Sequence, residues 1–480
     1  MKPLQDSRGS MMINRKSFLK LNSQVTVLGL GGLTVPAVAA NNTNGALKGT
    51  HYKATAKRMI YMFQSGGPSH VDLLDYKPIM KKFHGKELPA SVRGEQRLTG
   101  MTAKQKSFPV CASTKDFAQC GDSGLHISGH LPYLGKIADK ITIVKSVHTE
   151  AINHDPGITL INTGSQIPGG PSLGAWMDYG LGRLNQNLPG YIVLLSQGTG
   201  KNPGQPIFSR LWGSGFIPSV HQGVMFRSGE NPILYLNNQK GISRSLRRKM
   251  LDQLEKLNYA SYTNFQDQEI LTRNAQYDMA YRMQKSAPEV VDFSNEPDHV
   301  FKLYGEDARV PGTYAYNCLL TRRLIEKDVR MVQLFHRGWD QHGDLQTHLP
   351  SQCKNVDQAS AALVTDLEQR GLLDETMLVW GGEFGRTPYS QGKLGNGRDH
   401  HGRCFSIWMA GGGIAGGRTY GKTDDYCYNI DENPVHINDL NATILHGFGI
   451  DHHGLTYKYQ GLDRKLTGVE HVKVIKELFA

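Results

Sequence analysis

The sequence lacks most of the patterns that identify a class of protein directly. After residue 40 it contains no run of roughly 18 apolar residues, so we expect no membrane span in the mature chain. Its six cysteines include no C-x-x-C pair and offer no recognisable zinc ligand set. It also has neither the G-x-S-x-G turn of α/β-hydrolases nor an H-E-x-x-H zinc motif. The function must therefore be sought in residues that are dispersed along the chain.

Charge of either sign is also sparse. Charged residues make up 20% and hydrophobic residues 39% of the chain, which is typical of a globular protein with many loops. The formal net charge is +11, but residues 1–39 hold five Lys or Arg and one Asp, so the remainder carries +7. No nucleic-acid recognition module accompanies this mild excess, and we expect no nucleic-acid partner.

Residues 1–39 have the organisation of an export signal. A basic segment precedes the short apolar stretch Val25–Val35, and Ala37-x-Ala39 is a cleavage pattern. The order from Arg15 to Lys20 resembles a twin-arginine signal with Lys16 in the place of the second arginine; Sec export or an uncleaved anchor remain alternatives. We therefore predict a periplasmic or secreted protein. A disulfide is permissible there, with Cys111–Cys120 as the nearest pair in sequence.

Beyond a linker at residues 40–58, apolar runs alternate with helical patterns. The best helical pattern covers Val356–Arg370, and Gly371 ends it. This alternation predicts an α/β fold: a mostly parallel central sheet with helices on both faces, in one domain over residues 59–480. Residues 196–310, with one long helical pattern at Ser243–Tyr281, are predicted to be an insertion that covers the sheet. The predicted strands are Met59–Phe63, Ile141–Val144, Tyr191–Leu195, Val329–Phe335, Met377–Trp380 and Phe405–Met409.

Four of these strands run into segments rich in chemically active side chains. Because sites in such sheets gather at the carboxyl ends of strands, a shared site is the better interpretation. Ser69 lies in a glycine-rich turn after the first strand, where it could bind an anion, act as a nucleophile or cap a helix. The other residues at these ends are His70, His154, Asp340, His342 and Glu383.

Asp340, His342, Glu383 and His400 form an oxygen and nitrogen ligand set suited to a divalent metal such as Zn, Mn, Ca or Mg. Asp399 could be a further ligand or could orient the His400 imidazole. The alternative for each single histidine is a satisfied polar residue in a loop. Taken together, the four favour a metal site at the sheet edge, with their polar atoms within roughly 5–8 Å of one another.

Several segments resemble an exported bacterial family known as domain of unknown function 1501, a sulfatase-like branch of the alkaline phosphatase superfamily. They are "MFQSGGPSHVDLLDYKP", "GWDQHGDL", "WGGEFGRTP", "GRDHHG", "MAGGGIAGG" and "LNATILHGFGIDHHGLTYKYQGLDRKLTG". The resemblance covers residues 57–480. It implies a fold of the alkaline phosphatase and sulfatase type, and hydrolysis of phosphate or sulfate esters at one or two metal ions.

The resemblance also implies roles for single residues. Asp340 with His342 or His348 would match the superfamily's metal pair, and His400 or His401 would be its last metal histidine. Glu383 would fall at a strand-end ligand position. The aspartate expected directly after the first strand has no match, since "QSGGP" stands there and Asp72 lies further along.

In this register His154 lies at the place of the nucleophile, and no Cys-x-Pro-x-Arg is present for formylglycine chemistry. We expect His154 at the start of a helix through Ile158 and Ile161, where the helix end disfavours imidazolium and keeps it mostly neutral unless Asp155 or Glu150 compensates. It would act as general acid or base, or as a covalent phospho-acceptor. Arg386 would bind the equatorial oxygens of the ester.

The sequence thus predicts an exported metal-dependent hydrolase of phosphate or sulfate esters, including esters of glycans. The competing interpretation is a non-catalytic relative, a binding or assembly protein of the cell envelope that kept the fold and lost turnover.

Overall fold

The computed structural model describes residues 45–199, 206–229 and 231–480. The predicted export signal at residues 1–39 lies outside the described residues, as does the start of the predicted linker at 40–58. The described part of that linker lies against the body of the protein, since Ala46 N–H donates to Tyr179 O at 2.7 Å. Among the residues that the structure describes, no helix is both long and apolar enough to cross a membrane.

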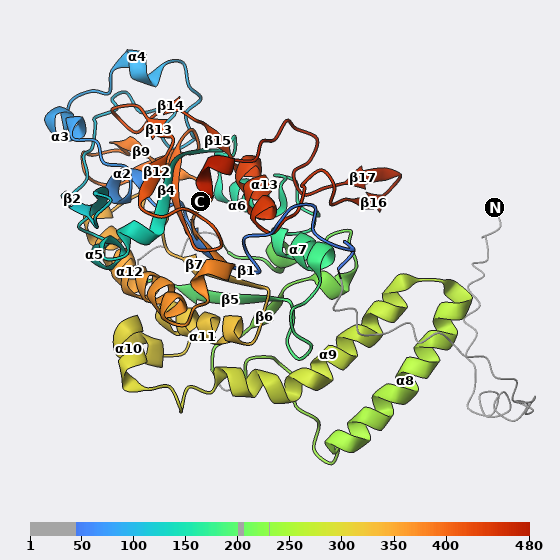
Figure 1. The fold of residues 1–480 in the computed structure, drawn as a ribbon. Coiled ribbons are helices and arrows are strands. Elements are labelled where there is room, and N and C mark those ends of the chain that lie inside the picture. The colour runs from blue at the N-terminus through green and yellow to red at the C-terminus, as the bar shows by residue number, and fades with distance from the viewer. Residues whose placement is uncertain (1–44, 200–205, 230) are drawn as a thin grey trace, which may run out of the picture. The chain divides into compact units, whose positions relative to one another are not determined.

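The six predicted strands form the centre of one large sheet (Figure 1). Its strand order is β12-β4-β11-β8-β1-β7-β5-β6, with β15 beside β4, and all neighbours run parallel except the two pairs that include β11. The prediction of a mostly parallel sheet is therefore confirmed. The strands are β1 (Arg58–Ser65), β4 (Ile141–His148), β5 (Tyr191–Gln197), β6 (Val224–Phe226), β7 (Met331–Arg337), β8 (Thr376–Gly381), β11 (Phe405–Ala410), β12 (Arg418–Tyr420) and β15 (Val435–His436).

Helices cover both faces of this sheet, as the sequence predicts. Alternate residues of β1 enter two separate cores, Ile60 and Met62 on one face and Tyr61 and Phe63 on the other. The first core is closed by α5 (Pro132–Gly135), α9 (Gln268–Val291), α10 (Asp298–Tyr304), α11 (Tyr314–Glu326) and α12 (Leu345–Gln369). The second core is closed by α6 (His154–Thr163), α7 (Leu173–Leu181) and α13 (Ile437–Gly447).

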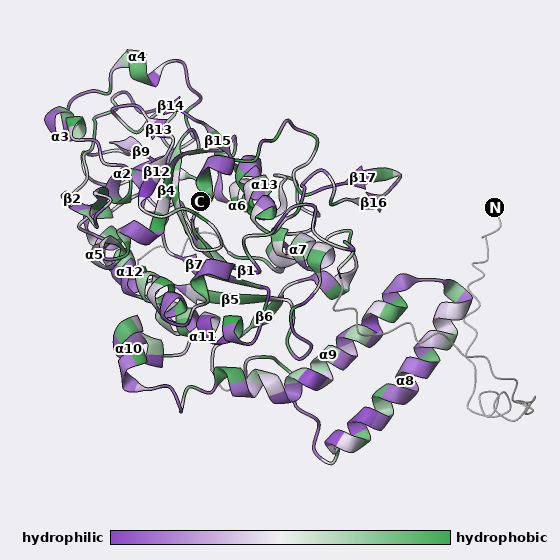
Figure 2. Cartoon of the chain, viewed as in Figure 1, coloured by the Kyte–Doolittle hydropathy of each residue, from purple (hydrophilic) through white to green (hydrophobic). Residues whose placement is uncertain are grey.

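The predicted insertion contributes strand β6 to the sheet edge and a hairpin of two long helices, α8 (Arg244–Phe265) and α9. The sequence predicts one continuous helical pattern here, but the chain breaks at Gln266, whose φ of 54° is left-handed, and Asp267 caps the next helix. Only Leu251 of α8 is buried, and apolar side chains stay exposed along it, including Phe265 at 76% (Figure 2). The hairpin stands away from the sheet over much of its length (Figure 1).

The remaining elements are short and lie around the sheet. All six cysteines are free, so the permissible pair Cys111–Cys120 is not joined. The short helices are α2 (His70–Leu73), α3 (Ile79–Phe83), α4 (Ala90–Arg93), η1 (Ala138–Lys140), η2 (Ser209–Trp212), η3 (Ser219–His221), η4 (Glu306–Arg309), η5 (Leu373–Glu375) and η6 (Lys476–Leu478). The short ribbons pair β2 (Phe117–Cys120) with β3 (Leu125–Ser128), β9 (Gly385–Ser390) with β10 (Arg398–His401), β13 (Lys422–Thr423) with β14 (Ile430–Glu432), and β16 (Tyr457–Tyr459) with β17 (Leu462–Arg464).

Two buried histidines predict that the fold is sensitive to acid. Burial lowers the pKa of His336 to about 3, and burial together with the neighbouring His70 lowers the pKa of His401 to about 3. Since the unfolded chain takes up these protons first, the stability they contribute is full above about pH 6.5 and is lost as the pH falls toward 3. We expect His336→Gln to flatten the slope of unfolding free energy against pH by roughly 1.4 kcal/mol per unit in this window.

Urea unfolding at pH 7, 6, 5 and 4 measures this slope. Exposed His299 gives the matched control, since His299→Gln removes an imidazole that is already in water. An unchanged slope in His336→Gln would show that the buried imidazole does not resist protonation.

Candidate metal centre

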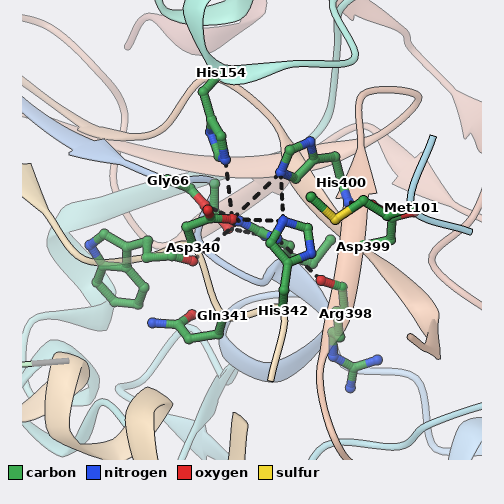
Figure 3. A network of polar contacts seen from close by, with 12 residues as sticks. Gly66, Met101, His154, Asp340, Gln341, His342, Arg398, Asp399 and His400 are labelled. Carbon is green, nitrogen blue, oxygen red and sulfur yellow. Dashed lines mark hydrogen bonds and ion pairs between the residues drawn. The ribbon is translucent and has the colours of Figure 1, made fainter. Parts of the chain in front are cut away.

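Three histidines and one aspartate converge at the carboxyl edge of the sheet (Figure 3). The Nε2 atoms of His342, His154 and His400 lie 2.9, 3.1 and 3.5 Å from Oδ1 of Asp340. One possible ligand atom from each of the four lies within 4.8 Å of the other three. We call these four residues, His154, Asp340, His342 and His400, the histidine cluster.

In each imidazole of the histidine cluster, Nδ1 lies within hydrogen-bond distance of an oxygen atom. His154 Nδ1 lies 2.5 Å from Glu383 Oε1, and His400 Nδ1 lies 2.9 Å from the carbonyl of Ile152. His342 Nδ1 lies 2.6 Å from Gln391 Oε1. Because these oxygens accept hydrogen bonds, each proton belongs on Nδ1, and the three Nε2 lone pairs point to one place.

This donor set fits a divalent metal ion. Neutral imidazoles oriented by an oxygen at their second nitrogen, together with one carboxylate, are the ligands that Zn and related transition metals prefer. Burial lowers the pKa of His400 to about 4, which keeps its lone pair free at neutral pH. Burial raises the pKa of Asp340, but the three imidazoles around its Oδ1 and the positive charge of Arg386 outweigh burial and hold that pKa well below its usual range.

Glycine permits the close approach of the strand ends that carry the histidine cluster. Gly66, directly after β1, has a φ of 117°, and a Cβ there would lie 2.7 Å from the backbone nitrogen of Asp340. The sequence "QSGGP", which offers no aspartate to the site, thus lets the end of β1 lie against the loop after β7. His154 enters as the first residue of α6, as predicted, and His400 lies in β10 opposite Arg386.

Glu383 lies beside the histidine cluster and not within it. Its carboxylate is fully buried and accepts the Gly66 N–H at 3.0 and 3.3 Å, while Oε1 faces His154 Nδ1. Glu383, predicted as a ligand, therefore orients a candidate ligand, and His154, predicted as a base or nucleophile, lies among the four residues that could hold an ion. The sequence could not separate these roles, because both residues follow strands that end at the same edge.

Replacing the charge behind His154 tests this relation. Glu383→Gln retains an acceptor for Gly66 and His154 but removes the negative charge that makes the imidazole a better ligand. We expect the affinity for zinc to fall by about 10- to 100-fold, the range found for partners of metal-bound histidines. Competitive titration with a chelator measures it. Affinity equal to that of the wild type would show that His154 does not ligate the ion.

The protonation of His154 differs from the sequence-based expectation. Burial lowers its pKa, but hydrogen bonds to Asp340 and Glu383 outweigh burial, so that its pKa is raised overall. The expectation of a mostly neutral imidazole allowed only for Asp155 or Glu150. Those carboxylates are engaged elsewhere, Asp155 with Arg210 and Glu150 with His436. A metal ion must therefore compete with the protonation of His154, so that binding weakens as the pH falls.

Arg386 holds the histidine cluster in place. It is 1% exposed, and its guanidinium donates to Asp340 Oδ1 at 2.6 Å, to Gly67 O at 3.0 Å and to Arg398 O at 3.1 Å. A further bond reaches the carbonyl of Gly66. With its donors used on the protein, Arg386 fixes the Asp340 carboxylate; that it binds the oxygens of an ester stays a prediction.

Asp399 and Ser69 both point to partners outside the histidine cluster. Asp399 accepts the hydroxyls of Thr99 and Thr102 through Oδ2, and its Oδ1 accepts the backbone N–H of His400 at 2.8 Å. Ser69 is fully buried and donates to Asp72 Oδ2 at 2.5 Å. Asp399 therefore supports His400 and is no ligand in this geometry, and Ser69 is tied to a carboxylate and not placed as a nucleophile.

His401 and His348 are the alternatives that the resemblance left open. His401 Nε2 lies 2.8 Å from the carbonyl of Tyr428, on the other side of β10 from His400, because successive residues of a strand face opposite sides. His348 lies outside the histidine cluster but lines a cavity beside it. Gln391 and the Ile152 carbonyl, which orient two of the histidines, carry no sequence signal by which they could have been found.

Comparison with known sequences places the chain in a family. Residues 56–479 match the sequence model of a family described as "Protein of unknown function (DUF1501)". The chain belongs to this family. No curated protein matches the chain by sequence. The family predicted from the short motifs is thus confirmed over nearly the whole length of the described residues, and every member of the histidine cluster lies within the matched range.

Solved structures similar to this DUF1501 chain include enzymes of the predicted superfamily. The crystal structure of Ps i-CgsB is 9% identical with a TM-score of 0.36, covering 82% of this chain and 72% of that one. Alkaline phosphatase from the Antarctic bacterium TAB5 is 10% identical at 0.30, covering 82% and 98%. The PsFucS1 sulfatase from Pseudoalteromonas sp. is 11% identical at 0.32, covering 83% and 68%. Since one fold hosts many activities, these likenesses assign no activity to this chain.

Proposed function

We propose that this chain is an exported metal-dependent hydrolase of phosphate or sulfate esters, including esters carried by glycans. One observation carries the proposal: three imidazoles, each held by an oxygen at Nδ1, turn Nε2 toward the carboxylate of Asp340. Such an arrangement is unfavourable without an ion, since the three rings keep water away from one another's Nε2 atoms. The sequence resemblance supports phosphate and sulfate esters as the class of substrate.

A divalent ion would supply Lewis acidity here, polarising an ester oxygen and acidifying water. The chain's own residues fix the geometry. His154, His342 and His400 present lone pairs, Asp340 supplies the negative charge among them, and Arg386 prevents that carboxylate from turning away. Ser69 donates its hydroxyl to Asp72, and His154 contacts Asp340 and Glu383, so neither side chain is free to attack the ester. Water is therefore the nucleophile in this proposal. It gives its hydroxyl to phosphorus or sulfur, the bond to the bridging oxygen breaks, and the alcohol leaves with a proton.

The proposed compartment is the periplasm or the exterior of the cell, and it depends on the amino-terminal signal. The basic segment, the apolar stretch and the Ala37-x-Ala39 pattern support cleavage near Ala39 or Ala40. Amino-terminal sequencing of protein from the native host tests this, and an intact leader on cytoplasmic protein would contradict it.

A second candidate function is metal binding without turnover, in a binding or assembly protein of the cell envelope. The engagement of Ser69 by Asp72 favours it, because the described site then contains no free hydroxyl nucleophile. Assays of 4-nitrophenyl phosphate and 4-nitrophenyl sulfate with zinc- or manganese-loaded protein decide between the two. Stoichiometric metal with hydrolysis supports the enzyme; stoichiometric metal without any hydrolysis supports the binding protein.

A further inference from the structure

We infer that the cavity beside the histidine cluster binds the alcohol part of the ester, and that this part is a polyhydroxylated group about the size of one sugar ring. The inference rests on the proposed function and names the substrate class for the same site. The cavity has a volume of about 320 Å³. Asp340 and His342 form part of its wall, so a ligand there lies directly against the histidine cluster.

The wall of this cavity contains no cationic side chain. It is formed by seven residues that all lie between positions 338 and 348: Gly338, Asp340, Gln341, His342, Gly343, Asp344 and His348. Arginine and lysine, the usual partners of an anion, are absent from these seven residues, and Arg386 behind them is used by the protein. The cavity is therefore suited to an uncharged polar group, with the anionic part of the ester left to the ion.

Gln341 offers this cavity an acceptor that nothing in the described protein uses. Its side chain is 4% exposed, and Nε2 donates to Gly338 O at 2.8 Å, which fixes the amide with Oε1 as the free end. Oε1 is buried and has no hydrogen-bond partner. A buried acceptor without a donor costs about 1–3 kcal/mol, so a ligand hydroxyl that donates to it would be favoured. Gln341 lies beside His342 (Figure 3).

Asp344 supplies a second acceptor, from a strained position. It precedes α12 as the N-cap residue, with a φ of 49° and ψ of 37°, and its side chain makes no capping bond. Aspartate at an N-cap ordinarily accepts a backbone N–H of the helix. Here the carboxylate is instead 66% exposed, and its Oδ2 lies 3.8 Å from Nε2 of His348. Strain of this kind, about 1–3 kcal/mol, is characteristic of functional sites.

The three polar groups of the cavity match a set of hydroxyls. Gln341 Oε1 and the Asp344 carboxylate accept hydrogen bonds, and the His348 imidazole can donate or accept one. A sugar ring presents several hydroxyls that both donate and accept, whereas a simple aryl or alkyl alcohol would leave the buried Gln341 Oε1 without a donor. A volume of about 320 Å³ is at the small end for ligand pockets, which suits one ring and not a longer chain.

Binding measurements on zinc-loaded protein test the inference without requiring turnover. Calorimetry compares glucose 6-sulfate and glucose 6-phosphate with ethyl sulfate and ethyl phosphate. We expect the sugar esters to bind at least tenfold more tightly, and Asp344→Ala and Gln341→Leu each to reduce that preference by about tenfold. Asp431→Ala, on an exposed residue of β14, is the matched control and should preserve the preference. Zinc content is measured for every variant.

Equal affinity for sugar and ethyl esters in the wild type would overturn the inference, as would a preference that survives both substitutions with zinc retained. Should Gln341→Leu fail to fold, Asp344→Ala decides alone, because the Asp344 side chain makes no capping bond and only a long, solvent-exposed contact with His348. The proposed function fails separately, when the zinc-loaded wild type binds these esters and hydrolyses none of them.

Discussion

Asp340→Asn is expected to lose the metal ion and, with it, all hydrolysis. Asparagine has the same shape and still offers an oxygen to Arg386, so the buried guanidinium keeps a partner and the fold is retained. What disappears is the only negative charge of the histidine cluster. We expect the zinc affinity to fall by more than about 100-fold, beyond the 10- to 100-fold range found for groups that only orient a ligand.

Zinc content after gel filtration, with circular dichroism for the fold, measures this effect. Asp399→Asn is the matched control, because the sequence left Asp399 open as a ligand while the structure turns it toward Thr99 and Thr102. It should retain its zinc. If Asp399→Asn loses the ion and Asp340→Asn keeps it, the histidine cluster is not the metal centre.

The second large effect is expected from Arg398→Met, and it concerns stability. Arg398 and Asp72 are both fully buried and form a two-pronged ion pair, with distances of 2.7 Å from Nε to Oδ2 and 3.0 Å from Nη2 to Oδ1. Removing the arginine leaves the Asp72 carboxylate in the interior without a positive charge, with the neutral hydroxyl of Ser69 still donating to it. We expect the free energy of unfolding to fall by about 3–5 kcal/mol, as for other broken buried pairs.

The double variant Asp72→Leu with Arg398→Met separates the charge from the packing. Because it removes both charges, we expect it to be more stable than Arg398→Met alone. Lys422→Met is the comparison at the surface, where the pair with Glu432 is exposed on both sides and contributes at most about 1 kcal/mol. Urea unfolding measures all three. A double variant that is no more stable than Arg398→Met would contradict the account.

The sequence predicted the fold well because its signals are local. Apolar runs such as Met59–Phe63 and the helical spacing around Val356 need only their neighbours to be interpreted, and each lies in the predicted element. The prediction that loops after several strands meet at one edge followed from parallel topology, and the structure brings His154, Asp340 and His342 of that set together.

The roles of the residues at that edge could not be predicted. They depend on how far each side chain extends and on which hydrogen-bond partners compete for it. Glu383 is long enough to meet an ion, but the N–H of Gly66 and the imidazole of His154 hold its carboxylate. Arg386 could bind the oxygens of an ester, but its N–H groups already donate to backbone carbonyls and to Asp340. Neither competition is visible in the order of residues, since Gly66 and His154 lie 317 and 229 positions from Glu383, and Gly67 and Asp340 lie 319 and 46 positions from Arg386.

The histidine cluster unites positions that are far apart along the chain, and this has a consequence for biosynthesis. His154 comes from the first third of the polypeptide, Asp340 and His342 from the third quarter, and His400 from a ribbon made only near the end. No nascent fragment that stops before β10 can hold an ion with all four groups. Loading must wait for a nearly complete chain, and an ion present at 1,000 times its dissociation constant would then add about 4 kcal/mol to stability. The metal would thus secure a finished molecule and could not help to nucleate one.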